Sequence, residues 1–600
     1  MRLSFNSCLI LAAFIGVSEA QNCPFLGPAY PPATNVQAPA FVAAKAAFDK
    51  GLTDALTNGK ISGASTSFAI QIYSGSSKTP IHTSYHTPTA SNGTRTTTVG
   101  GDTVFRAHSI SKLITVYTIL SKLGDKYWDE PLSKYLPEFS HLQGGNPAYD
   151  ANWDEITLGS LASLMSGIGR DYALNDLSVT GNVSSQLSGV RPLLDYERIK
   201  CGAAGLRACT RAGTLPNNPP LSSSQHPNPN ILTEALQAVL TVFPFTSAFS
   251  SPNYSNMAFQ LLAYAIENIT ATPFPDLVRK QLIEPLNLRH TFLTTPTNLT
   301  ADAVKVSGWD QDFGDEAPSA GYYLSASDLT TLGTSILSST LLSPVLTRKW
   351  LKPLTHTSSL LTSLGRPWEI IRSRVPVSSG AKTTRIIDVY TKQGGGATYT
   401  SLIALSPAHN LGITILTAGL PGGSDFATIK ALALDTFIAA AEQAARDAAG
   451  SAYGGNYTLS ATSAAELGLL PDEPGLFLKT LTSNGTDVLA MAKQLGGFQG
   501  SGKLGAWFYP MGLVGRAFSG NEVPFRGTFG LVGAPAGEDC ASWASVDRWR
   551  YGGYPADLAV FGVSGQGSVS SVQFPFLNER IYRKSGNAGD GVFGPFEPGE

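Results

Sequence analysis

Residues 103–120 read TVFRAHSISKLITVYTIL, an extended apolar start followed by a helical pattern. From Ser109 onward the apolar residues recur at the spacing of one helix face, which predicts that Ser109 opens a helix packed against a core. Ser109 and Lys112 then lie one turn apart on the same face. A lysine held neutral there can take the proton of the serine hydroxyl, and the helix N-terminus adds partial positive charge. This stretch is therefore a candidate nucleophile site.

The Ser-x-x-Lys spacing is weak evidence by itself. It occurs again at Ser379 and Lys382, in a Ser/Gly-rich stretch without a helical pattern. The alternative interpretation of Ser109 is an N-cap serine followed by a solvated lysine. Companion motifs elsewhere in the chain must decide between the two.

Composition indicates an ordered globular protein of 600 residues, with 42% apolar residues and a net charge of −2. This length favours two or three domains. A charge near zero gives no reason to expect nucleic acid or an anionic membrane as a partner. We expect neither a metal nor another cofactor: there is no His-Glu-x-x-His motif, and His82 and His86 would lie roughly 13 Å apart on a strand. The sequence predicts no particular oligomeric state.

Residues 1–20 predict a cleaved signal peptide. Arg2 precedes an apolar run at 9–17, and small residues stand at positions 18 and 20. The run is too short to span a bilayer, so we expect no membrane span, although an N-terminal anchor is the alternative. The mature chain would begin at Gln21 and be secreted to the extracellular space.

Cysteines and sequons fit a secreted chain. Four cysteines follow the signal peptide: Cys23, Cys201, Cys209 and Cys540. In an oxidising compartment an even number suggests disulfides, most simply Cys201 with Cys209 and Cys23 with Cys540, while the two other pairings stay open. Sequons predict glycosylation at six asparagines: Asn92, Asn182, Asn268, Asn298, Asn456 and Asn484.

Periodicity predicts an α+β unit over residues 21–449. Beyond the segment that starts at Ser109, helices are predicted at 40–57, 155–167, 257–267, 276–288, 326–337 and 426–449, and strands at 66–74, 399–405 and 411–417. This order predicts an antiparallel sheet covered by helices. Residues 171–250 form an irregular insertion, either a lid or pocket rim or a surface decoration. Short strand-like runs predict a mostly β domain at 450–584, before a disordered tail at 585–600.

Two further motifs stand in order after the candidate nucleophile. Tyr254 begins the chain's one Tyr-x-Asn, which ends at Asn256 and directly precedes a predicted helix. Lys392 begins a Lys-x-Gly that is completed by Gly394 and followed by Gly395, just before the predicted hairpin at 399–417. Lys-x-Gly recurs elsewhere in the chain, so its order and context give it weight.

Together these motifs resemble the serine β-lactamase and penicillin-binding-protein superfamily, closest to the class C β-lactamase-related branch and its fungal secreted members. The stretches that carry the resemblance are FRAHSISK at 105–112, NYSNMAFQLL at 253–262 and KQGGGATYTS at 392–401. It covers about residues 40–449 and implies a β-lactamase/transpeptidase-like antiparallel sheet flanked by helices.

The resemblance also implies roles for individual residues. Ser109 would be the acylated nucleophile, Lys112 its proton acceptor, and Tyr254 the general base or leaving-group acid. Substrate binding is implied for Asn256, Lys392, Gly394 and Gly395, with the N–H groups of Ser109 and Gly395 forming an oxyanion hole. Two lysines beside Tyr254 should lower its pKa, and each lysine should lower the pKa of the other.

The third motif departs from the β-lactamase pattern. Gln393 stands where a hydroxyl residue is common, and Thr398 where a glycine often precedes the aromatic. These departures weaken the case for β-lactam hydrolysis and leave the acyl-transfer residues in place. A seventh sequon, at Asn253, overlaps the Tyr254 motif, and we expect it to carry no glycan because sugar there would block the pocket.

We predict a secreted serine hydrolase that acts on ester or amide bonds of small molecules. An α/β-type Ser-His-Asp hydrolase is disfavoured because the chain has no Gly-x-Ser-x-Gly, and His108 is expected to be a packing residue. Two alternatives stay open: an acyltransferase or transesterase that uses the same acyl-Ser109, and a non-catalytic binding protein that retains the fold.

Overall fold

A computed structural model describes most of the chain, in these ranges: 24–77, 79–88, 98–140, 150–171, 243–297, 303–311, 313–396, 398–420, 422–496, 498, 501–512, 521–533, 542–564 and 568–583. Several predicted features lie outside the described residues. They are the signal peptide, the tail at 585–600, most of the insertion at 171–250, the cysteines Cys23, Cys201, Cys209 and Cys540, and the sequon residues Asn92, Asn182 and Asn298.

The larger part of the molecule is built on an antiparallel sheet with the strand order β2-β1-β10-β9-β8-β7-β6-β5. Its strands are β1 (Ser67–Ser74), β2 (His82–His86), β5 (Thr355–His356), β6 (Thr362–Leu364), β7 (Glu369–Pro376), β8 (Thr384–Gly395), β9 (Tyr399–Ser406) and β10 (Leu411–Ala418). The predicted hairpin is β9–β10, and β1 pairs along the whole of β10. The first strand of the chain therefore lies one position from the edge of the sheet, between β2 and the last strand of the sheet, β10.

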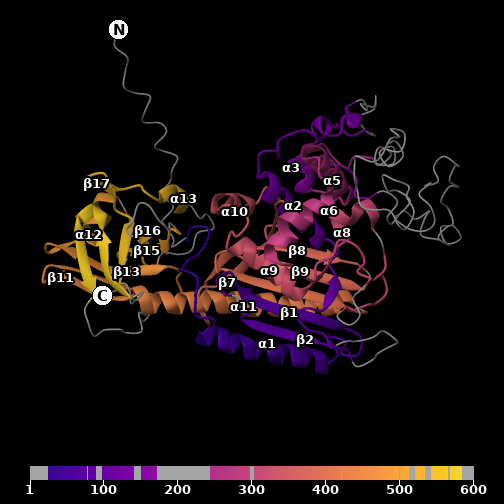
Figure 1. Cartoon of the computed structure of the whole chain (residues 1–600). Coiled ribbons are helices and arrows are strands. Elements are labelled where there is room, and N and C mark those ends of the chain that lie inside the picture. The colour runs from indigo at the N-terminus through magenta and orange to yellow at the C-terminus, as the bar shows by residue number, and fades with distance from the viewer. Residues whose placement is uncertain are drawn as a thin grey trace, which may run out of the picture.

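Helices cover both faces of this sheet (Figure 1). Side chains along β1 alternate between two cores, because successive residues of a strand point to opposite faces. Phe68, Ile70 and Ile72 pack with α1 (Pro39–Thr57) and α11 (Gly422–Tyr453), whereas Ala69 and Tyr73 belong to the core shared with the other helices. All eight residues of β1 are buried, so the sheet is the middle of three layers.

The second helical layer holds the candidate motifs. Its helices are α2 (Ile110–Leu123), α3 (Leu158–Ala162), α5 (Met257–Thr270), α6 (Phe274–Val278), α7 (Glu284–Leu286), α8 (Ala317–Ala320), α9 (Ala326–Leu337) and α10 (Pro344–Trp350). The helix predicted at 276–288 is composite, because a π-helical turn at Arg279–Ile283 separates α6 from α7. A short ladder of β3 (Val104–Arg106) with β4 (Tyr323–Ser325) leads the chain into α2.

The C-terminal part is a closed barrel with its own core. Its strands are β11 (Gly455–Ser460), β12 (Ser463–Gly468), β13 (Leu476–Ser483), β15 (Leu504–Pro510), β16 (Glu522–Leu531), β19 (Leu558–Val563), β20 (Val569–Phe574) and β21 (Glu579–Arg583). Pairing of β12 with β13 closes these eight strands, and β14 (Thr486–Asp487) extends the edge of β13. The predicted fold class, α+β with a mostly β C-terminal domain, is confirmed.

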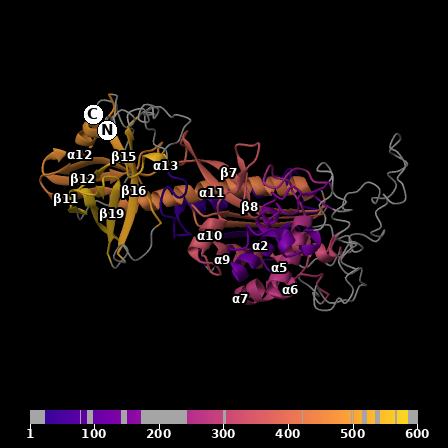
Figure 2. The same cartoon turned by 90° about the horizontal axis from the view of Figure 1, so that it is seen from above.

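Helix α11 joins the two parts (Figure 2). The sequence predicts an end at residue 449, but the helix continues to Tyr453, so the predicted domain boundary falls inside a helix. Phe426 and Phe437 belong to the core below the sheet, whereas Ala445 and Ala449 belong to the core of the barrel. Packing at both ends therefore keeps the alanine-rich helix continuous past the expected boundary.

A buried ionic cluster fastens α11 to the sheet. Arg385 of β8 donates two hydrogen bonds to Glu442 of α11, at 2.8 and 2.6 Å. His409, in the β9–β10 turn, lies 2.8 Å from the same carboxylate through Nε2 and 2.8 Å from Ser406 Oγ through Nδ1. Burial opposes the charge of Glu442, but Arg385 and His409 outweigh it and lower the Glu442 pKa to about 2.

Replacing Glu442 should destabilise the fold strongly. Glu442→Ala leaves the guanidinium of Arg385 buried without its carboxylate, which costs about 3–5 kcal/mol of unfolding free energy. Urea unfolding measures this loss. The control is Asp54→Ala, which breaks the exposed ion pair with Lys50 and should leave stability almost unchanged. Equal losses in the two variants would contradict a stabilising role for the cluster.

Candidate active site

Ser109 lies where β3 turns into α2. It is the N-cap residue of α2 and is half-buried, while the side chains that follow it from Ile110 to Leu120 are buried. His108 before it has a φ of 46°, a left-handed conformation that a non-glycine residue adopts only when its surroundings hold it. The His108 ring packs near Phe313 and Tyr399, and burial lowers its pKa to about 4. The packing of His108 thus holds the turn that carries Ser109 in one conformation.

Lys112 is completely buried and has three hydrogen-bonding neighbours. Its Nζ donates to Asn256 Oδ1 at 2.6 Å and to the carbonyl oxygen of Ser319 at 3.0 Å, and it lies 3.1 Å from Ser109 Oγ. Burial lowers the Lys112 pKa, and the charge of Lys392 adds to this. A neutral amine has two N–H donors and one lone pair. Because the two carbonyl oxygens can only accept, the lone pair of a neutral Lys112 would face the hydroxyl groups of Ser109 and Tyr254, both of which lie beside it.

The orientation of Asn256 is itself fixed. Asn256 is the N-cap residue of α5, and its Nδ2 donates to Asp171 Oδ1 at 2.6 Å. A carboxylate only accepts, so the amide oxygen must face Lys112. Arg170 Nε in turn lies 3.1 Å from the other oxygen of Asp171. Asn256 therefore orients Lys112, in addition to any contact with substrate that the family resemblance implies.

Tyr254 lies between the two lysines of the site. Its ring centre is 4.8 Å from Lys112 Nζ and 5.3 Å from Lys392 Nζ. Burial disfavours the phenolate, but Lys392, Lys112 and a hydrogen bond with Ser109 outweigh burial and lower the Tyr254 pKa to about 8. The direction of this shift agrees with the expectation from the sequence.

The pKa of Lys392 is raised, although a neighbouring lysine is expected to lower it. Burial acts to lower its pKa, but Glu369 and Tyr254 outweigh burial, so the Lys392 pKa is raised. Glu369 Oε1 lies 2.5 Å from Lys392 Nζ, and the other carboxylate oxygen accepts the N–H of Gln393 at 3.0 Å. No motif in the sequence pointed to this carboxylate.

Strand β8 closely approaches the turn that carries Ser109. A Cβ atom at Gly394 would lie 2.1 Å from the carbonyl oxygen of Ala107 and 2.9 Å from the nitrogen of Ser109. Only glycine allows this approach. Next to it, Gly395 has open space where a side chain would be.

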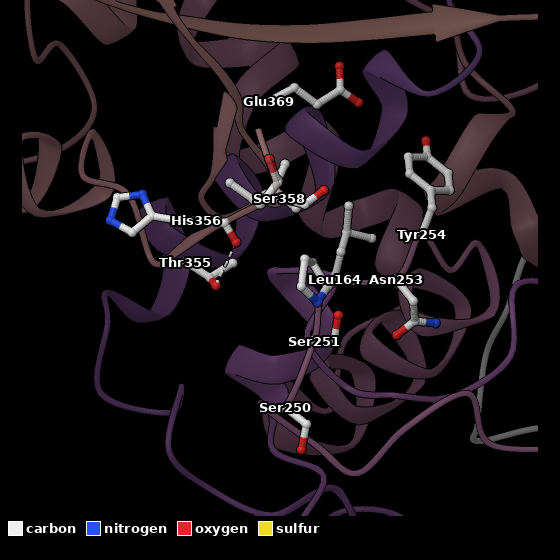
Figure 3. Close-up of a pocket in the computed structure, with 12 residues that line it drawn as sticks. Leu164, Ser250, Ser251, Asn253, Tyr254, Thr355, His356, Ser358 and Glu369 are labelled. Atoms are coloured by element: carbon white, nitrogen blue, oxygen red, sulfur yellow. Dashed lines mark hydrogen bonds between the residues drawn. The ribbon is translucent and has the colours of Figure 1, made fainter. Parts of the chain in front are cut away.

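A pocket of about 510 Å³ lies beside Tyr254. Figure 3 shows Tyr254 and Glu369 in its upper part, with the segments around Ser250 and His356 forming other walls. It is lined by Leu164, Ser250, Ser251, Pro252, Asn253, Tyr254, Thr355, His356, Thr357, Ser358, Leu364 and Glu369. The volume is within the range of small-molecule sites.

Other candidates from the sequence lie away from this site. Ser379 and Lys382 stand between β7 and β8, where the N–H of Ser379 donates to Gln443 of α11. The sequon residues Asn268, Asn456 and Asn484 are exposed, and their glycosylation stays a prediction. Asn253 Nδ2 donates to the carbonyl oxygen of Ile168 at 2.6 Å, which engages the nitrogen that a glycan would need.

Two further observations concern the described part of the chain. It contains no group of three or more His, Cys, Asp or Glu side chains placed to hold a metal ion. None of its helices has both the length and the apolar character needed to cross a membrane.

Comparison with known proteins identifies the family to which the chain belongs. The sequence model of the Beta-lactamase family matches residues 79–437. The chain belongs to the β-lactamase family. A second model, described as the Beta-lactamase-like-like C-terminal domain, matches residues 445–585, which contain the barrel.

Relatives of this β-lactamase family protein cover nearly its whole length. A "Beta-lactamase-like protein" of Arthroderma benhamiae is 30% identical over 564 residues, which are 87% of this chain and 88% of the relative. A "Probable hydrolase M10" of a Phoma species is 26% identical, over 89% of this chain and 87% of its own. Among solved structures, the octameric penicillin-binding protein homologue of Pyrococcus abyssi aligns with a TM-score of 0.45 at 13% identity, covering 89% of this chain and 99% of that one.

The structure brings together every residue to which the sequence gave a catalytic or binding role, and it adds others. Ser319 and Asp171 hold Lys112 and Asn256, and Glu369 holds Lys392. Glu316 is also buried near this group: burial and Asp171 raise its pKa to about 7, although Lys112 opposes them. None of these residues belongs to a short motif, because each meets its partner only through the fold.

Adding a methyl group at Gly394 should displace Ser109. Because the new atom would collide with the backbone on both sides of His108, we expect Gly394→Ala to slow labelling of Ser109 by a fluorophosphonate about 100-fold. Labelling rates come from intact-protein mass spectrometry. Gly395→Ala, whose added methyl group would enter open space, is the matched control for folding and should keep the wild-type melting temperature. Labelling of Gly394→Ala at the wild-type rate would show that the close approach is unimportant.

Proposed function

We propose that this β-lactamase family protein is a serine hydrolase that forms an acyl-enzyme on Ser109 and cleaves ester or amide bonds of small molecules. One observation carries the proposal. Two carbonyl oxygens take the N–H donors of the buried Lys112, and its third position faces Ser109 Oγ at 3.1 Å. A buried amine held in this way can serve as a base for a hydroxyl nucleophile.

The reaction follows from this geometry. Ser109 Oγ bonds to the substrate carbonyl carbon, and its proton passes to the amine of Lys112 or to the phenolate of Tyr254. The N–H groups of Ser109 and Gly395 stabilise the negative charge on the carbonyl oxygen. The bond to the leaving group then breaks, and the leaving group receives that proton from Tyr254, either directly or by relay from Lys112. Water gives a proton to the same base as it adds to the acyl carbon, and that proton passes to Ser109 Oγ when the acyl–oxygen bond breaks, which releases the acid.

Several other features support the proposal. A relative of the chain is described as a probable hydrolase, and the pocket beside Tyr254 has the size of a small-molecule site. Gln393 and Thr398 replace the residues common in β-lactamases, which favours ordinary esters or amides over β-lactams as substrates. The apolar N-terminal run and the many sequons support secretion with glycosylation and disulfides.

Removing the nucleophile tests the proposal directly. Wild-type protein should gain the mass of a fluorophosphonate adduct, and Ser109→Ala should gain none while keeping its melting temperature. The mass is measured on the intact protein, and parallel incubation with a penicillin shows whether the same serine accepts a β-lactam. Ser379→Ala, in the second Ser-x-x-Lys of the chain, is the matched control and should label like the wild type. A labelled Ser109→Ala would place the nucleophile elsewhere.

The Tyr254 pKa predicts a pH dependence. The pKa of about 8 lies below the reference value of 10, so the phenolate fraction rises from about 1% at pH 6 to half at pH 8. If the phenolate is the base, kcat/KM for p-nitrophenyl acetate should rise about tenfold per pH unit below pH 8 and level off above it. Tyr254→Phe should lose this rise, whereas Tyr127→Phe should retain it. A wild-type profile that is flat between pH 6 and 8 would rule out Tyr254 as the base.

A further inference from the structure

We propose that Glu369 makes the pocket beside Tyr254 reject substrate groups that carry a carboxylate and accept neutral or cationic groups that carry hydrogen-bond donors. This proposal rests on the proposed function, because it names the substrate class of that same site. It concerns a residue that no motif of the sequence identifies.

The carboxylate of Glu369 is fixed in place by β8. Glu369 opens β7 opposite Thr391, and Thr391 Oγ1 donates to its backbone oxygen at 2.5 Å. One carboxylate oxygen accepts from Lys392 Nζ at 2.5 Å and the other from the N–H of Gln393 at 3.0 Å. Both oxygens are therefore anchored on the strand that ends at the nucleophile.

The two charges of this ion pair differ in what they face. The side chain of Lys392 is 0% exposed, whereas that of Glu369 is 29% exposed and lines the pocket. Lys430 is also nearby, but its Nζ donates to Gln393 Oε1 at 3.2 Å and it is not a lining residue. A molecule in the pocket thus meets the carboxylate of Glu369, while the ammonium of Lys392 lies behind it and is already paired.

The described walls of the pocket offer this carboxylate no free cation, since Arg170, whose guanidinium lies 4.9 Å from the centre of the Tyr254 ring, is not a lining residue and is paired with Asp171. The described residues that line the pocket include neither lysine nor arginine, and most of the polar ones carry a hydroxyl group: Ser250, Ser251, Thr355, Thr357 and Ser358. Figure 3 shows His356 pointing away from Tyr254 and Glu369. Hydroxyl groups and one carboxylate suit a ligand that donates hydrogen bonds, such as an alcohol, an amide or an amine.

A substrate carboxylate could reach Lys392 only by displacing Glu369. That exchange would leave one carboxylate without its partner close to another negative charge, and uncompensated charge at a partly buried site is strongly unfavourable. The ion pair therefore acts as a filter on substrate charge. A neutral or cationic group needs no such exchange.

Matched substrates test this filter. The acyl series consists of p-nitrophenyl esters of adipic acid, of its monoamide and of 6-aminohexanoic acid. The leaving-group series consists of the acetate esters of 4-hydroxyphenylacetic acid and of its amide. We expect wild-type kcat/KM to favour the amide over the acid by roughly tenfold or more in at least one series. The ratio within one protein is the readout, so a general loss of catalysis in a variant does not affect it.

Two variants and a control locate the effect. Glu369→Gln should lower the amide-to-acid ratio about tenfold, because Lys392 then has no carboxylate partner. Ser358→Lys adds a cation at an exposed position of the wall without touching Lys392, and it should lower the ratio several-fold even if Glu369→Gln fails to fold. Glu284→Gln makes the same chemical change in the exposed pair with Arg279 and should leave the ratio unchanged.

The outcomes separate this proposal from the proposed function. Equal rates for acid and amide in both series, or a ratio that neither variant changes, would overturn the filter. Fluorophosphonate labelling of Ser109 is measured in every variant. If Ser109 is labelled but acid and amide substrates react equally well, the charge filter is overturned and the proposed serine hydrolase function still holds. A wild-type protein with neither labelling nor turnover would overturn both.

Discussion

The site depends on how a buried lysine distributes its hydrogen bonds. The amine of Lys112 has three directions in which to interact, and oxygens that can only accept occupy two of them. The third direction is thereby left for the hydroxyl groups of Ser109 and Tyr254 before any substrate arrives. Asp171 and the backbone of α8 thus influence Ser109 through other residues, since they determine which way Asn256 and Lys112 point.

The sheet and the helical layer contribute different parts of the same site. The helices supply the serine, the lysine and the tyrosine, each at or near a helix start. Strand β8 supplies a glycine that fits against the serine turn, and then a lysine whose charge is held by the neighbouring strand. Because the two layers share one large core, the distance between Ser109 and β8 is set by packing across the whole unit.

The sequence predicted what is local and missed what is remote. Short motifs identified Ser109, Tyr254 and Lys392, because each has a signature within a few residues. Their partners are separated by 207 residues for Lys112 and Ser319, by 85 for Asn256 and Asp171, and by 23 for Lys392 and Glu369. Strands β7 and β8 were not predicted either. Strand β8 contains three charged residues, Arg385, Asp388 and Lys392, so its sequence does not look like that of a buried strand. In the structure each of these residues forms an ion pair with an oppositely charged side chain.

The unbroken course of α11 determines how the barrel can move. Two domains that are joined by a loose linker can turn relative to each other without losing internal hydrogen bonds. Here the connection is a helix whose ends are embedded in two different cores, and Arg446 in its last third also donates to Tyr30 and to the backbone oxygen of Leu470. A change of angle between the two parts would have to bend or unwind that helix. The barrel is therefore held at a fixed angle to the β-lactamase-like unit by the helix that the two parts share.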